Sequence, residues 1–170
     1  PLPEAQQDRF MFKVFVKYPS FREEFEVARR TTALDIDDVD PVLDAEEILQ
    51  LQRIVREVPV TDHVIRYTLS LVRQTRVGHE GSPDFIQEMV AWGAGPRGVL
   101  TLVTAAKARA ILHGRYHATV NDVQAVAKPA LRHRIAGNYA AQANNVDSER
   151  LIDMLMEVVP ADREYKKPAA

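Results

Sequence analysis

The stretch Trp92-Gly-Ala-Gly-Pro-Arg-Gly98 predicts the start of the most regular helix in the chain, which continues through an alanine-rich sequence to about His113. Proline favours the first helical position, and this places Arg97 in the first turn. Gly114 is a typical helix terminator. The many alanines along one face predict close contact with another helix. This segment therefore indicates a packed helical domain.

Further helices are predicted on both sides of this one, because capping residues precede apolar sequences with helical spacing. Before it, helices are expected from Ser20 to Arg30, Asp44 to Pro59, Asp62 to Arg76 and Ser82 to about Trp92, with Ser82 as the cap. After it, helices begin near Thr119 and Asp147, with an irregular segment at Ile135 to Val146 between them. Pro129 should kink or interrupt the Thr119 helix, because it lacks a backbone donor. The pattern predicts a helical bundle.

One segment near the start differs from the rest. Phe10 to Tyr18 is rich in aromatic and β-branched residues and predicts a buried β-strand. A single strand cannot form a sheet, so its neighbours must lie elsewhere. Without them the strand should be disordered, pair with a second copy or pack against the helices. The predicted fold class is therefore mainly α, with a helical bundle preceded by one strand.

The composition narrows the functional classes. The chain has 170 residues, no cysteine and a net charge of -2, so disulfides and thiolate metal sites are excluded and nucleic-acid binding is disfavoured. No apolar run approaches the roughly 18 residues of a membrane span. His113 and His117 have the spacing of a helical metal pair, but Gly114 and the Thr119 cap separate them, so no metal site is expected. A cytoplasmic setting fits these features.

Two arginines are candidates for function. Arg97 lies at the positive end of a helix dipole, where a cation is mildly unfavourable and where a phosphate is readily bound. Arg9 precedes the predicted strand, from which a loop could present it to a transferring phosphoryl group. The alternative for each is structural. Arg97 could pair with a nearby acid, and Arg9 could pair with the adjacent Asp8.

Three long motifs occur together. They are Pro1-Leu-Pro-Glu-Ala-Gln-Gln-Asp-Arg-Phe10 before a strand ending at Tyr18-Pro19, Gly93-Ala-Gly-Pro-Arg97 before a helix ending His113-Gly-Arg115, and Thr119-Val-Asn-Asp-Val123 leading to Lys128-Pro-Ala-Leu-Arg-His-Arg-Ile135. In order and spacing they resemble the C-terminal part of MoxR-type AAA+ ATPases, relatives of the magnesium-chelatase ATPase subunit. The family often has serine where this chain has Gly95.

The resemblance implies a division of the chain. Residues 1–19 would be the end of the nucleotide-binding core with its last strand, and residues 20–43 a connecting helix and linker. Residues 44–160 would form the α-helical lid domain, and residues 161–170 a disordered tail.

The resemblance also implies a mechanism. Arg9 matches the arginine finger, which reaches the nucleotide of a neighbouring subunit, and Arg97 matches the sensor 2 arginine, which contacts the nucleotide of its own subunit. ATP and Mg2+ would be bound by the full-length protein in a homo-oligomeric ring, expected to be a hexamer. Hydrolysis would remodel or mature client proteins, including metal insertion, and clients could contain von Willebrand factor A domains. This chain lacks the Walker A and Walker B motifs, so we expect negligible hydrolysis from it alone.

Two other functions remain open from the sequence. A self-standing helical interaction module explains the helices but not an apolar strand at the start. A helix-turn-helix DNA-binding unit could use Thr119 to Ile135, although Pro129 and the net charge of -2 count against it. Salt-sensitive binding to duplex DNA would favour the latter.

Overall fold

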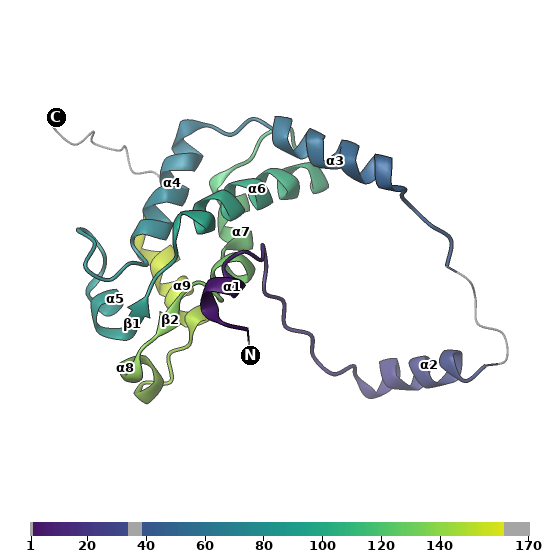
Figure 1. Cartoon of the computed structure of the whole chain (residues 1–170), viewed down its shortest axis with the longest axis horizontal. Coiled ribbons are helices and arrows are strands. Elements are labelled where there is room, and N and C mark those ends of the chain that lie inside the picture. Colours follow the sequence, from purple (N-terminus) through teal and green to yellow (C-terminus); the bar gives the residue numbers. More distant parts are fainter. Residues whose placement is uncertain (1, 34–38, 162–170) are drawn as a thin grey trace.

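The computed structural model describes residues 2–33 and 39–161, and these form a mainly α-helical structure (Figure 1). Within these ranges, three helices of four to six residues and two short strands accompany the longer helices. The elements in chain order are α1 Glu4–Gln7, α2 Phe21–Thr31, α3 Ala45–Glu57, α4 Asp62–Arg73, α5 Asp84–Met89, β1 Val90–Trp92, α6 Pro96–Leu112, α7 Val120–Leu131, β2 Ala136–Gly137, α8 Tyr139–Ala143 and α9 Ser148–Val158. The mainly α fold class is confirmed.

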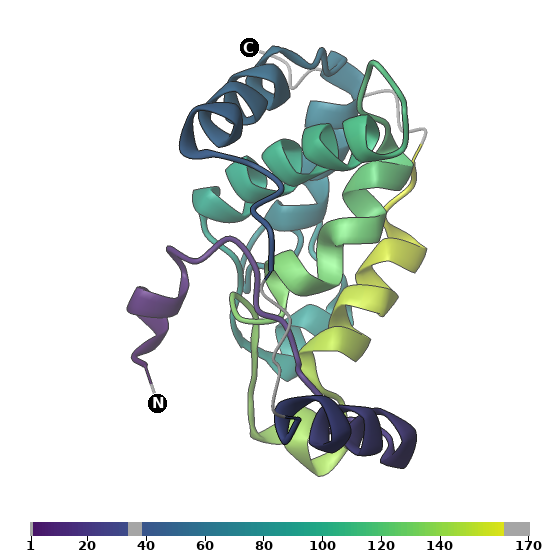
Figure 2. The same cartoon turned by 90° about the vertical axis from the view of Figure 1, so that its right-hand side faces the viewer.

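The core lies between α4, α6, α7 and α9, and Figure 2 shows α7 and α9 side by side. Its fully buried side chains include Leu71, Leu102, Leu131, Ile152 and Leu155. The alanines of α6 allow close packing, as predicted, because α6 and α7 form the most extensive helix pair and their alanines at 106, 110, 127 and 130 are completely buried. Within the described residues, no helix is both long and apolar enough to cross a membrane.

The capping residues fix most helix starts where the sequence places them. Ser20, Asp44 and Thr119 each form a capping box with the acidic residue three positions later. Pro96 begins α6, and Gly114 follows its end with a φ of 67°. Pro129 does not interrupt α7, which continues to Leu131, because the proline lies in the last turn, where few further backbone bonds are affected.

Two local predictions were wrong. The helix expected from Ser82 to Trp92 is capped by Pro83 and ends at Met89, after which the chain forms β1. The segment expected to be irregular contains β2 and α8. The two strands pair antiparallel, with Val90 opposite Gly137. Strands this short carry too few residues for a period-2 pattern, so only the fold brings them together.

The predicted strand at Phe10 to Tyr18 runs as an extended chain, and no strand is assigned to it. Its first part packs against the bundle, and the amide of Lys13 donates to the carbonyl of Pro129 at 2.9 Å. Packing against the helices was one of three outcomes expected for a strand without sheet partners. Helix α2 has no buried residue and lies apart from the bundle (Figure 1). Of the tail predicted to be disordered, all but Ala161 lies outside the described residues.

Candidate functional site

The loop before α6 is held in place by the end of α4. The amide of Ala94 donates to Thr75 Oγ1 at 2.8 Å, and Arg76 Nε donates to the Ala94 carbonyl at 2.9 Å. Glycine is required at position 93, because an added Cβ would lie 2.1 Å from the Thr75 carbonyl oxygen. These contacts fix the position of the α6 N-terminus, and hence of Arg97.

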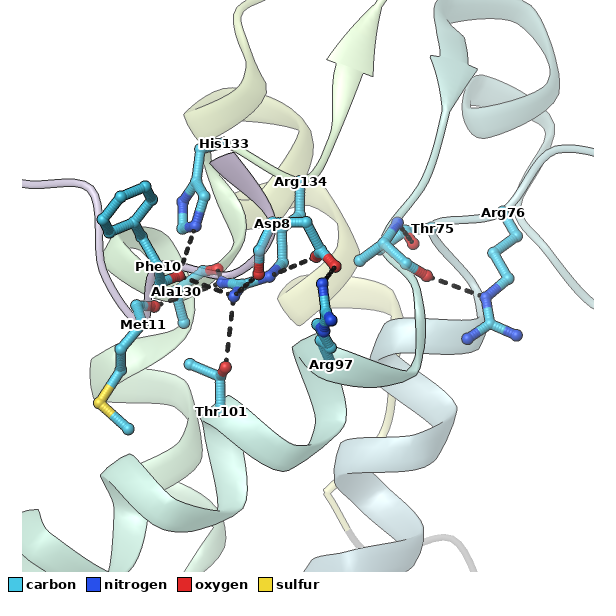
Figure 3. A network of polar contacts seen from close by, with 11 residues as sticks. Asp8, Phe10, Met11, Thr75, Arg76, Arg97, Thr101, Ala130, His133 and Arg134 are labelled. Carbon is cyan, nitrogen blue, oxygen red and sulfur yellow. Dashed lines mark hydrogen bonds and ion pairs between the residues drawn. The ribbon is translucent and has the colours of Figure 1, made fainter. Parts of the chain in front are cut away.

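Arg134 is the centre of a polar network between the bundle and the N-terminal segment (Figure 3). Its side chain is only 1% exposed. Nε donates to Asp8 Oδ1 at 3.0 Å, and Nη2 donates to the carbonyls of Asp8 and Phe10 at 2.7 and 2.8 Å. Nη1 donates to the carbonyls of Met11, at 3.3 Å, and of Ala130. One buried side chain thus holds the backbone on both sides of Arg9.

The charge of Arg134 is balanced inside this network. Burial lowers the pKa of the guanidinium, and the hydrogen bond and charge of Asp8 oppose that shift. A buried cation without such a partner would be strongly destabilising. The carboxylate of Asp8 is therefore a structural requirement of this site.

Asp8 also contacts the predicted phosphate-binding arginine. Arg97 Nη1 lies 3.4 Å from Asp8 Oδ2, and the Arg97 side chain is 60% exposed. Arg97 and Arg134 converge on this single carboxylate (Figure 3). The pairing with a nearby acid, which was the structural alternative for Arg97, is therefore present. The exposure leaves most of the guanidinium open to solvent at the N-terminus of a 17-residue helix.

Arg9 follows Asp8 directly and is exposed. Its guanidinium carbon lies 5.6 Å from the centre of the Phe10 ring, a distance at which a cation–π contact forms. Asp8 was the acid expected as an alternative partner of Arg9. Its carboxylate instead pairs with Arg134 and Arg97. The two predicted arginines are thus connected through Asp8.

The basic sequence after α7 helps to dock the same segment. His133 Nε2 lies 3.0 Å from the Phe10 carbonyl oxygen, which can only accept, so Nε2 carries the proton. Burial lowers the pKa of His133, with the neighbouring Arg134 charge acting in the same direction. Arg132 lies over the Phe15 ring at 4.6 Å. The basic residues at the end of the third motif therefore make contacts inside the molecule.

A second charged cluster stabilises the opposite end of α6. Asp122 is completely buried and receives two hydrogen bonds of 2.5 Å from Arg115, one of 2.6 Å from Arg109, and bonds from the Thr119 backbone and hydroxyl. These hydrogen bonds, among which those from Arg115 have the largest effect, hold the pKa of Asp122 well below its usual range. All of its partners are internal, so this cluster is structural.

Sequence reasoning missed Asp8 and Arg134 as members of the site. Both lie in motifs that were noted, but 126 positions separate them along the chain. Asp8 was considered only as a local partner of Arg9, and Arg134 only as part of the third motif. A possible signal was the unusual run Arg-His-Arg before the apolar Ile135, which is 4% exposed.

Comparisons with known proteins relate this chain to a protein family. Residues 85–155 match the AAA lid domain family. The chain is 34% identical over 160 residues to YeaC, an uncharacterized protein of Bacillus subtilis (strain 168), covering 94% of the chain and 47% of that protein. It is also 34% identical over 159 residues to Chaperone MoxR1 of Mycobacterium tuberculosis H37Rv, covering 94% of the chain and 42% of that protein.

A solved structure agrees with these relatives. The crystal structure of a candidate ATPase from Cytophaga hutchinsonii superposes with a TM-score of 0.88 at 29% identity, covering 96% of this chain and 50% of that one. The chain therefore contains an AAA lid domain. It matches the C-terminal part of MoxR-type AAA+ proteins, as its three motifs indicated. It spans about half the length of the relatives that it matches.

Replacing Arg134 by methionine should release the N-terminal segment from the bundle. Methionine fills much of the same space but donates no hydrogen bond to the carbonyls at positions 8, 10 and 11. We expect the Lys13 amide to exchange with solvent about 10- to 100-fold faster, as expected for the loss of a buried network. Hydrogen exchange measured by NMR tests this. The same substitution at the exposed Arg150 should leave the Lys13 amide protected, and equal protection in both variants would contradict the anchoring role.

Proposed function

We propose that this chain is the lid-containing part of a cytoplasmic ring ATPase of the MoxR type. In the complete protein, ATP binds between subunits of a homo-oligomeric ring, expected to be a hexamer. Hydrolysis changes the angle between lid and core, and this motion remodels or matures client proteins, including by metal insertion. Clients with von Willebrand factor A domains are one class to test. The name of the Mycobacterium tuberculosis relative, Chaperone MoxR1, supports action on other proteins.

The observation that carries this proposal is the position of Arg97. An exposed guanidinium lies in the first turn of a 17-residue helix, and the first turn of α6 has no acidic residue. The backbone dipole and the side chain therefore present positive charge in the same place. This combination favours phosphate oxygens, because guanidinium forms charge-assisted bonds with them. Arg97 would contact the nucleotide of its own subunit.

The described residues fit only part of an ATP site. Arg97 and Arg9 supply two exposed cations for phosphate oxygens, and Asp8 is already engaged by two arginines. Mg2+ needs oxygen ligands, and phosphates need a glycine-rich loop, both of which would come from the nucleotide-binding core. When bound, ATP supplies the phosphoryl group. Arg97 would orient it, and Arg9 of a neighbouring subunit would stabilise the charge that develops.

The proposed division of the chain follows from the same assignment. Residues 1–19 would belong to the end of the core, residues 20–43 would connect core and lid, and residues 44–160 would form the lid. The Arg134 network supports a defined contact between the first and third parts, because it joins residues 8–11 to the end of α7.

The test is to replace Arg97 by alanine in the complete protein. We expect ATP to bind about 10- to 100-fold more weakly, because a charge-assisted hydrogen bond contributes roughly 1.5–3 kcal/mol. Binding of a fluorescent ATP analogue to the assembled protein would measure this. Arg29→Ala is a matched control, because Arg29 is also exposed and also in an ion pair, with Glu26 on α2. Unchanged ATP affinity in Arg97→Ala would contradict the proposed contact.

A further inference from the structure

Asp8 lies between a fixed arginine and an exposed one. Its Oδ1 accepts from buried Arg134 at 3.0 Å, and its Oδ2 lies 3.4 Å from Arg97. The Asp8 side chain is 29% exposed, so it is not freely solvated. Because Arg134 also holds the backbone carbonyl of Asp8, the carboxylate has a defined position relative to α6. The Arg97 side chain, by contrast, is 60% exposed and has Asp8 as its ion-pair partner.

We propose that Asp8 takes the place of a phosphate for Arg97 when no nucleotide is bound, and so couples Arg97 to the neighbouring Arg9. The inference rests on the proposed contact between Arg97 and phosphate. A carboxylate and a phosphate are both oxygen anions that accept from the same guanidinium nitrogens. Binding of phosphate to Arg97 must therefore compete with Asp8 for the bonds at Nη1.

The coupling follows from chain connectivity. When Arg97 leaves, Asp8 keeps its contacts with Arg134 but loses one positive neighbour. The adjacent Arg9 then faces a carboxylate with less of its charge balanced. The conformational preference of Arg9 should shift in response, because charged side chains on adjacent residues interact through the solvent. Asp8 is thus a positioning residue, and it does not itself contact nucleotide in this scheme.

Asp8→Asn isolates the proposed competition. Asparagine keeps an oxygen that can accept from Arg134 Nε, but it removes the negative charge that attracts Arg97. Because that charge also balances Arg134, protection of the Lys13 amide in the variant is measured alongside, to show that the Arg134 bonds to the carbonyls of residues 8 and 10 still hold the segment on the bundle. We expect tripolyphosphate, used as the probe at low ionic strength, to bind the chain about two- to fivefold more tightly. This range corresponds to the loss of an exposed ion pair from the free state. The matched control is Asp153→Asn, since Asp153 is 33% exposed and pairs with Lys128 at 2.9 Å.

Two NMR readouts distinguish competition from a general effect of charge. The first readout is the affinity for tripolyphosphate, measured from the chemical shift of the Arg97 Nε–Hε group. Where Arg97 is replaced, the chemical shift of the Gly98 amide reports this affinity instead. A double-mutant cycle compares Asp8→Asn in the presence of Arg97 and in an Arg97→Ala background. The second is the Arg9 backbone amide shift at probe saturation. Competition predicts tighter binding only when Arg97 is present, and an Arg9 shift that is lost in Asp8→Asn.

Each other outcome overturns the proposal. Equal tightening in both backgrounds would mean that Asp8 acts by through-space charge alone. No tightening, or an Arg9 shift that persists in Asp8→Asn, would exclude the coupling while leaving the contact between Arg97 and phosphate intact. Equal binding by the wild type and Arg97→Ala would reject that contact, and the competition with it. The last result alone counts against the proposed function.

Discussion

Replacing Arg9 by alanine in the complete protein should lower kcat for ATP hydrolysis by about 10³- to 10⁵-fold, the range that arginine fingers contribute in phosphoryl transfer. Arg9 is exposed and lies beside a backbone segment that Arg134 holds in place, so its removal costs no core contact. ATP affinity should change little, because the guanidinium acts mainly as charge develops. Steady-state hydrolysis and analogue binding, measured together, separate the two effects.

Subunit mixing tests whether Arg9 acts on a neighbouring subunit. Arg9→Ala subunits would be mixed with subunits in which the Walker A lysine of the core is replaced. Activity should return, because the nucleotide site of an Arg9→Ala subunit is intact and can receive Arg9 from a neighbouring Walker A variant. The same mixture made with Arg97→Ala should stay inactive if Arg97 serves its own subunit. Return of activity there would show that Arg97 serves a neighbour, and Arg29→Ala alone should remain fully active.

The Asp122→Asn variant should lose about 2–4 kcal/mol of unfolding free energy. Asp122 is completely buried and joins Arg109, Arg115 and Thr119, so removal of its charge leaves two arginines with a weakened partner. Urea denaturation followed by circular dichroism measures this, and an unchanged m-value would show that stability alone has changed. The control Asp153→Asn breaks a surface pair and should cost under about 1 kcal/mol. Equal losses in both variants would refute the special role of Asp122.

The contribution of Asp122 should also depend on pH. Hydrogen bonds from Arg115, above all, lower its pKa in the folded state, relative to an unfolded value near 3.8. A lowered carboxyl pKa gives stability that is fully present above the unfolded value and is lost as the pH falls toward the folded value. The difference in unfolding free energy between wild type and Asp122→Asn should therefore be constant above about pH 5 and shrink below about pH 4. A difference independent of pH from 5 to 2 would contradict this assignment.

The sequence determined most helix boundaries, because their signals are local. Ser20, Asp44 and Thr119 each satisfy free backbone donors within three residues, and Pro96 and Gly114 delimit α6 through their own backbone preferences. The alanines of α6 also indicated its close partner. These features need no knowledge of distant residues, and they were sufficient for the mainly α fold. The family was indicated separately, by the resemblance of the three motifs.

The strands and the fate of the N-terminal segment needed the fold. β1 and β2 total five residues, too few for a periodic pattern. They form because the fold places the end of α5 beside the start of α8, where the Asn138 amide donates to the Met89 carbonyl. The apolar residues from Phe10 to Tyr18 predicted a buried strand, and this was wrong, because no strand forms there and the segment is exposed. Whether such a chain joins a ladder depends on partners that its own sequence does not encode.

The sequence by itself also selected Arg9 and Arg97, since each occupies a position where local physics gives little reason for an arginine. Only the tertiary structure connected them. Asp8 and Arg134 meet across 126 positions, and their contact depends on how the end of α7 packs beside the N-terminal segment. Capping and helix propensity act within a few residues, whereas the balance of a buried charge depends on whichever groups the fold brings to it. That is why the sequence could select the two arginines as candidates but could not place the carboxylate beside them.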